Sequence, residues 1–120
     1  MADGFSGLRR TTLSGVPVLS FEHPGELTAA ESAQFQAAAS ETLAGEDRVV
    51  LDLGHVGFLD SSGLSALVSI NRAMSARGAE LRLAAPGRAV VAVLELTRLH
   101  RLFEIYETVD AAVMSFREGG

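Results

Sequence analysis

The sequence has no cysteine and no lysine, since all ten of its basic residues are arginine. Without cysteine the chain can form no disulfide, no thiolate metal site and no cysteine nucleophile. Without lysine it has neither the lysine of a phosphate-binding P-loop nor the amine of a Schiff-base enzyme. These two absences exclude several large classes of enzyme and metalloprotein.

The sequence also has no apolar run near the roughly 20 residues that a membrane-spanning helix needs. Arg9 and Arg10 are soon followed by Pro17 and polar residues, so the N-terminus lacks the apolar stretch of a secretory signal peptide. We therefore expect a cytoplasmic protein with no membrane insertion. Its net charge of −5 argues against direct binding to nucleic acid, because such proteins usually carry a basic face.

The length and composition indicate one globular domain, with 120 residues of which 48% are hydrophobic and 21% charged. Segments typical of strands and helices alternate along the chain, which predicts an α/β fold: a mostly parallel mixed sheet with right-handed crossovers and about four helices. A tight turn near Gly15 predicts an antiparallel edge hairpin at the N-terminus. We expect the domain to span 8–117, with flexible ends at 1–7 and 118–120. The expected strands are 11–15, 16–23, 48–53, 80–86 and 102–108, and the expected helices are 28–43, 64–77, 87–97 and 109–116.

Two helix starts carry recognisable signals. Thr28 followed by Glu31 has the spacing of a capping box, and Gly25 to Leu27 before it is interpreted as a loop. The second start lies in the stretch "GFLDSSGLSALV" at 57–68, where an apolar run stops at Asp60 and a helical pattern begins at Leu64. Asp and Ser are favoured as helix caps, so either Asp60 or Ser62 is a candidate cap there.

A single cap does not explain why Asp60 is followed by Ser61, Ser62 and Gly63. Glycine lets another backbone approach closely. A serine here could also accept a phosphate, because the unpaired N–H groups and dipole of a helix start favour negative charge, while Asp60 would repel it. The residues alone leave two roles open: a cap and nothing more, or a phosphorylation switch.

A serine nucleophile is a third alternative. A nucleophile elbow reads G-x-S-x-G, but Leu59 and Asp60 lie two residues before Ser61 and Ser62, so the first glycine is missing.

The other chemical alternatives lack partners in the sequence. His23, His55 and His100 are scattered without metal-ligand spacing, so we expect neither a metal nor a cofactor. Asp52 ends a strand, as a phospho-acceptor aspartate of a receiver domain does. The acidic pair and the lysine that such a site needs are missing.

The segment around the serines resembles the core signature of STAS domains, and in particular the single-domain anti-sigma-factor antagonists of bacteria. The resemblance rests on "RVVLDLGHVGFLDSSGLSALVSI" and on "LRLAAPGRAVVAVLELTRLHRLFEIYETVDAAV", with "GEL" at 25–27 before the first helix. It covers roughly residues 12–116. It depends chiefly on the D-S-S-G-L motif in its context.

The resemblance implies a phosphorylation switch at Ser61. In that family a serine protein kinase, which is also the anti-sigma factor, phosphorylates the first serine of the motif. The unphosphorylated antagonist binds the kinase and frees the sigma factor, and a PP2C-type phosphatase resets the switch. The chain would then be a phosphoprotein and binding module of a bacterial stress response that regulates transcription by partner switching, not an enzyme. The residues implied to bind the partner are Asp60, Ser62, Gly63, Leu64 and Thr28.

Alternatives remain beside this reading. The chain could be an STAS scaffold or accessory subunit of a stress-signalling complex or membrane transporter, or a small serine hydrolase. Two positions depart from the family: Thr28 replaces a frequent Asp, and Arg98 replaces a frequent Gly. Arg98 would place a cation near the end of a helix, where the dipole favours it, or would mark a different partner surface. The favoured interpretation is an ordinary solvated arginine.

Overall fold

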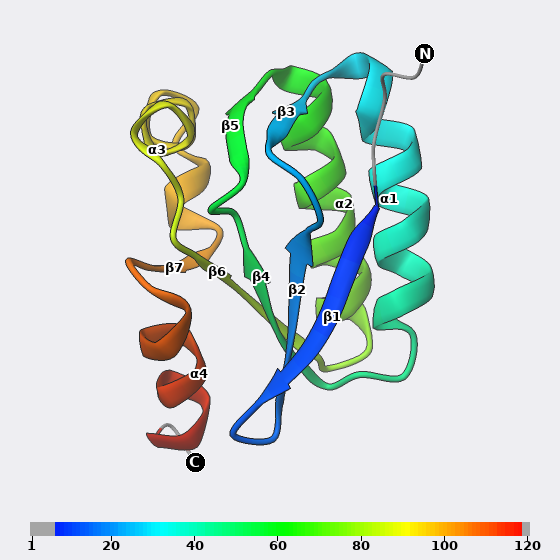
Figure 1. The fold of residues 1–120 in the computed structure, drawn as a ribbon, viewed down its shortest axis with the longest axis vertical. Helices are drawn as coiled ribbons and strands as arrows, with labels where there is room; N and C mark the ends of the chain where they lie inside the picture. The colour runs from blue at the N-terminus through cyan, green and yellow to red at the C-terminus, as the bar shows by residue number, and fades with distance from the viewer. Residues whose placement is uncertain (1–6, 119–120) are drawn as a thin grey trace.

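The computed structural model describes residues 7–118, and most of the ends expected to be flexible, 1–6 and 119–120, lie outside this range. Strands and helices alternate along the described chain (Figure 1). The elements are β1 (Leu8–Leu13), β2 (Val16–Phe21), β3 (Gly25–Leu27), α1 (Ala29–Leu43), β4 (Arg48–Asp52), β5 (Val56–Leu59), α2 (Ser61–Ala76), β6 (Glu80–Ala84), α3 (Arg88–Leu96), the 3-10 turn η1 (Leu99–Arg101), β7 (Glu104–Tyr106) and α4 (Val109–Glu118).

The main sheet has five strands in the order β1-β2-β4-β6-β7. Only β1 and β2 pair antiparallel, and β2, β4, β6 and β7 pair in parallel. Helices α1 and α2 lie on one face of this sheet and α4 lies on the other (Figure 1). The α/β fold, the edge hairpin and the four helices predicted from the sequence are therefore confirmed.

Each face of the sheet has its own core. The larger core joins the sheet to α1, α2 and α3, and contains fully buried side chains such as Phe35, Leu51 and Leu67. The smaller core lies under α4 and includes Val50 and Phe116. Burying side chains of this size stabilises the fold by roughly 1.5–3 kcal/mol each, so the larger core dominates and fixes the positions of α1 and α2.

Two strands were not predicted. Gly25–Leu27, interpreted as a loop, pairs in parallel with Val56–Leu59 to form a second, two-stranded sheet. Both strands are short, and each contains a glycine, a residue depleted in strands, so neither shows a clear alternation of apolar and polar residues.

Several boundaries also differ from the prediction. The hairpin turn lies at Ser14 and Gly15, both with positive φ (51° and 82°), which suits the right-handed twist of a tight hairpin. Consequently β1 runs from Leu8 to Leu13 instead of 11–15. Helix α2 begins at Ser61, three residues before the predicted start, and the last strand is preceded by η1.

Candidate functional site

The candidate site lies where β3 and β5 each lead directly into a helix. The parallel pairing sets Leu27 opposite Leu59, so the next residues, Thr28 and Asp60, lie alongside each other. The backbone N–H of Asp60 donates to the carbonyl oxygen of Leu27 at 3.3 Å. The small β3–β5 sheet, which was not predicted from the sequence, thus brings the starts of α1 and α2 together.

Asp60 is the cap of α2. Its Oδ1 accepts hydrogen bonds from the backbone N–H of Ser62 at 2.9 Å and of Gly63 at 3.1 Å. These bonds satisfy two of the N–H groups that a helix start leaves without a partner. Of the two candidate caps, the structure selects Asp60 over Ser62.

Ser61 is the first residue of α2, and its side chain is exposed. Because Asp60 supplies the cap, the Ser61 hydroxyl is not needed for it. Ser62 beside it is half-buried, and the first turn of α2 contains no acidic residue. The positive end of the helix dipole at Ser61 is therefore balanced by Asp60, which precedes the helix.

Gly63 is buried against Leu27, the last residue of β3. A Cβ atom at this position would lie 2.3 Å from the carbonyl oxygen of Leu27 and 3.0 Å from Cβ of Leu59. The room that Gly63 provides is therefore occupied by the backbone of Leu27. Leu64 belongs to the core with 7% of its surface exposed, so both residues shape the site from beneath.

Thr28 and Glu31 form the predicted capping box at the start of α1. Glu31 Oε1 accepts hydrogen bonds from the backbone N–H of Thr28 at 2.9 Å and from its hydroxyl at 2.6 Å. The Thr28 hydroxyl, followed by its N–H, holds the pKa of the Glu31 carboxyl below its ordinary value, and the nearby charge of Asp60 opposes this effect. Thr28 itself is half-buried.

Ser61 also lines an open groove of about 340 Å³ along α2. Its α2 wall carries the exposed residues Ser65, Ser69 and Arg72, and Leu99 of η1 lines it as well. Sequence analysis missed this surface, although the spacing of four residues between Ser61, Ser65 and Ser69 places all three on one helix face. The participation of η1 had no signal in the sequence.

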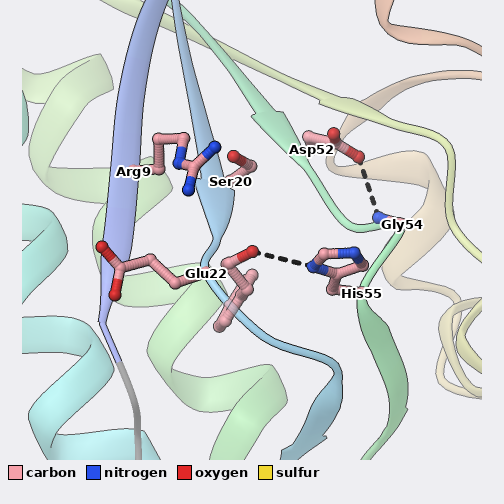
Figure 2. Close-up of a pocket in the computed structure, with 7 residues that line it drawn as sticks. Arg9, Ser20, Glu22, Asp52, Gly54 and His55 are labelled. Carbon is pink, nitrogen blue, oxygen red and sulfur yellow. Dashed lines mark hydrogen bonds between the residues drawn. The ribbon is translucent and has the colours of Figure 1, made fainter.

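A second pocket, of about 140 Å³, lies near the carboxyl ends of β2 and β4 and is shown in Figure 2. It brings Ser20, Asp52 and His55 together, which makes it the natural place to look for a serine hydrolase site. In such a site the aspartate orients the histidine. Here His55 Nδ1 donates to the carbonyl oxygen of Phe21 at 2.9 Å, and Asp52 Oδ1 accepts from the N–H of Gly54 at 2.9 Å (Figure 2). The pocket therefore gives no support to the hydrolase alternative.

Within residues 7–118, no group of three or more His, Cys, Asp or Glu side chains is placed to hold a metal ion. In the same part of the chain, no helix has the length and apolar character that crossing a membrane requires.

A family model, curated proteins and solved structures all match this chain. The family model described as STAS domain matches residues 10–112. A candidate anti-sigma factor antagonist of Thermotoga maritima is 34% identical over 73 residues, which cover 61% of this chain and 65% of that protein. The chain thus spans slightly less than two thirds of this curated relative's length.

Two solved structures share the fold at modest identity. A crystal structure of a candidate anti-sigma factor antagonist from Thermotoga maritima has a TM-score of 0.81 at 26% identity, covering 92% of this chain and 94% of that chain. The anti-sigma factor antagonist from Mycobacterium paratuberculosis also has a TM-score of 0.81, at 27% identity, and the match covers 92% of each chain.

Proposed function

Because the chain belongs to the STAS domain family, we propose that it is an anti-sigma-factor antagonist switched by phosphorylation. When unphosphorylated, it binds a serine protein kinase that acts as an anti-sigma factor, and so releases the sigma factor. The names of its relatives, which are anti-sigma factor antagonists, support the antagonist part of this proposal. The observation that carries the proposal is Ser61, an exposed hydroxyl at the first position of α2 whose capping task is taken by Asp60.

Phosphorylation of Ser61 would change the surface while sparing the fold. A phosphoserine adds about 1.5 to 2 negative charges, which the unpaired N–H groups and the dipole of a helix start favour. Asp60 repels the phosphate, so the two effects partly cancel and the helix persists. A docked partner surface that fits the neutral hydroxyl would instead meet two adjacent negative groups. A PP2C-type phosphatase would find the phosphate accessible, because Ser61 is exposed.

The docking surface in this proposal is centred on Ser61. Asp60 and Ser62 adjoin Ser61 in the chain, Thr28 lies at the neighbouring helix start, and each of the three is half-buried. Gly63 and Leu64 contribute indirectly by holding the first turn of α2 against Leu27. In this role the chain is a phosphoacceptor and binding module that acts in the cytoplasm without a cofactor and without touching nucleic acid.

Phosphorylation in vitro tests the acceptor. The chain is incubated with ATP and each purified serine kinase of the anti-sigma type from its own genome, and the product is measured by intact-mass spectrometry. We expect one added phosphate, which Ser61→Ala abolishes. Ser65→Ala is the matched control, since Ser65 is exposed one turn further along the same helix face and should leave labelling unchanged. Labelling of Ser61→Ala as strong as that of the unchanged chain would refute the assignment.

The charge effect is tested by Ser61→Asp. We expect this variant to bind the labelling kinase about tenfold or more weakly, because like charges at an interface are strongly unfavourable. Its thermal unfolding should stay close to that of the unchanged chain. An unaltered affinity would count against the switch.

A further inference from the structure

The end of α3 and the turn that follows it carry exposed apolar side chains. Leu96 is 84% exposed and Leu102 is 47% exposed, whereas most large apolar side chains are buried. Between the flanking carboxylates Glu95 and Glu104, segment 96–103 contains Arg98 and Arg101 and no acidic residue, although the whole chain has a net charge of −5. We call Leu96, Arg98, Leu99, Arg101 and Leu102 together the η1 patch.

The backbone of the patch is strained at Arg98. This residue has φ of 63°, in the left-handed region that glycine adopts without cost and other residues adopt rarely. Its N–H donates to the carbonyl oxygen of Glu95 at 3.0 Å, and its own carbonyl oxygen accepts from the N–H of Arg101 at 3.2 Å. A glycine would make both bonds without strain. An exposed arginine that bears this conformational cost points to a role for its side chain.

The patch continues the groove that contains Ser61. Leu99, the central residue of the patch, lines this groove together with Ser61, and Arg72 lines it as well. The patch therefore meets the groove at Leu99, and Arg72 adds a cation on the groove's α2 wall. In a chain of opposite net charge, such a local basic and apolar surface indicates a partner with carboxylates.

We propose that the η1 patch is the second half of the docking surface for the kinase, and that it binds a kinase segment combining acidic and apolar side chains. This inference rests on the function proposed above. The exposed leucines would anchor apolar side chains, and Arg98 and Arg101 would pair with carboxylates and fix the orientation of the partner. An anionic membrane is the less suitable partner, because the net charge of −5 is repelled by it.

Calorimetric titration of the full chain with the kinase that labels Ser61 tests the proposal. One variant combines Leu96→Ser with Leu102→Ser, and the other combines Arg98→Gln with Arg101→Gln. We expect each to weaken binding by about tenfold or more, and the arginine variant also to reduce the salt dependence of binding. Arg88→Gln is the matched control, because Arg88 is exposed at the opposite end of α3; it should change the affinity by less than about twofold.

The outcomes separate this inference from the proposed function. If both double variants bind like the unchanged chain while Ser61→Asp binds weakly, the patch is refuted and the switch stands. If the double variants bind weakly and Ser61→Asp binds like the unchanged chain, the η1 patch is supported as a docking surface and the phosphorylation switch at Ser61 is refuted. If the unchanged chain binds no such kinase, both are refuted. Flotation with phosphatidylglycerol vesicles that is lost in the double variants would refute a protein partner in favour of a lipid surface.

Discussion

The starts of α1 and α2 lie side by side but are completed in different ways. In α1, the carboxylate of Glu31 lies within the first turn and accepts from both the N–H and the hydroxyl of Thr28. In α2, the carboxylate of Asp60 lies before the helix, and the first turn contains no acidic residue. The first start is therefore neutralised by its own helix, whereas the second keeps an exposed hydroxyl, Ser61, at its positive end. One topology provides two helix ends, and the side chains determine how each end is capped.

The two starts are nevertheless mechanically joined. The carbonyl oxygen of Leu27 accepts from the N–H of Asp60, and the same oxygen faces Gly63 so closely that no Cβ atom would fit between them. The charge of Asp60 also acts on Glu31. A disturbance at the junction should consequently affect α2 through its contact with the segment before α1.

The largest expected effect comes from separating the two starts. Gly63→Ala would place a Cβ atom 2.3 Å from a backbone oxygen that cannot rotate away. We expect a loss of about 3 kcal/mol in the free energy of unfolding, at or above the usual range for overpacking, measured by urea denaturation. Gly57→Ala is the control, because its Cβ atom would lie 3.7 Å from the oxygen of Gly25, an ordinary contact. If the urea midpoint of Gly63→Ala equals that of the unchanged chain, the close contact between Gly63 and the carbonyl oxygen of Leu27 is contradicted.

A smaller effect should distinguish the two caps. Asp60→Ala removes the acceptor of two backbone N–H groups and should cost about 1–2 kcal/mol of unfolding free energy. Thr28→Ala removes the hydroxyl half of the capping box, while the bond from the Thr28 N–H to Glu31 remains, so its cost should be below about 1 kcal/mol. Asp60→Asn serves as the control, since an amide oxygen can accept the same bonds. If Asp60→Ala and Thr28→Ala lose the same unfolding free energy, the caps of α1 and α2 contribute equally and the two helix starts do not differ in this respect.

The difference between the starts was only partly predictable from the sequence. The capping box followed from the spacing of Thr28 and Glu31, because both partners lie within one helical turn. The main sheet and helices followed from the alternation of segments. The cap of α2 stayed open between Asp60 and Ser62, because the prediction placed the helix start at Leu64 instead of Ser61.

The features that join the starts had no local signal. Strands β3 and β5 are short and contain glycine, so their pairing was missed, and with it the contact between Leu27 and Gly63. Arg98 was recognised as a departure from the family pattern and interpreted through its charge. Its left-handed backbone explains why glycine would suit that position, and a dihedral angle of this kind is not visible in the sequence.

The smallest expected effect concerns the pH dependence of the α1 start. Hydrogen bonds from Thr28 lower the pKa of Glu31 in the folded chain below its ordinary value of 4.5. Glu31 therefore stabilises the fold above that value, and this contribution is lost as the pH falls through the lower, folded-state pKa. Because Glu31 is only half-buried and solvent screens its charge, we expect the contribution to stay below about 1 kcal/mol.

The test compares Glu31→Gln with the unchanged chain by urea denaturation between about pH 6 and about pH 3. The stability difference between the two proteins should be largest at the upper pH and should shrink toward the lower pH, because protonated Glu31 and glutamine are both neutral. Thr28→Ala is the matched control: it removes the hydroxyl that lowers the pKa most but keeps the N–H bond, so it should reduce the pH-dependent part without abolishing it. A difference that does not vary with pH would show that Glu31 does not neutralise the α1 start by its charge, and the contrast with α2 would then rest on the caps alone.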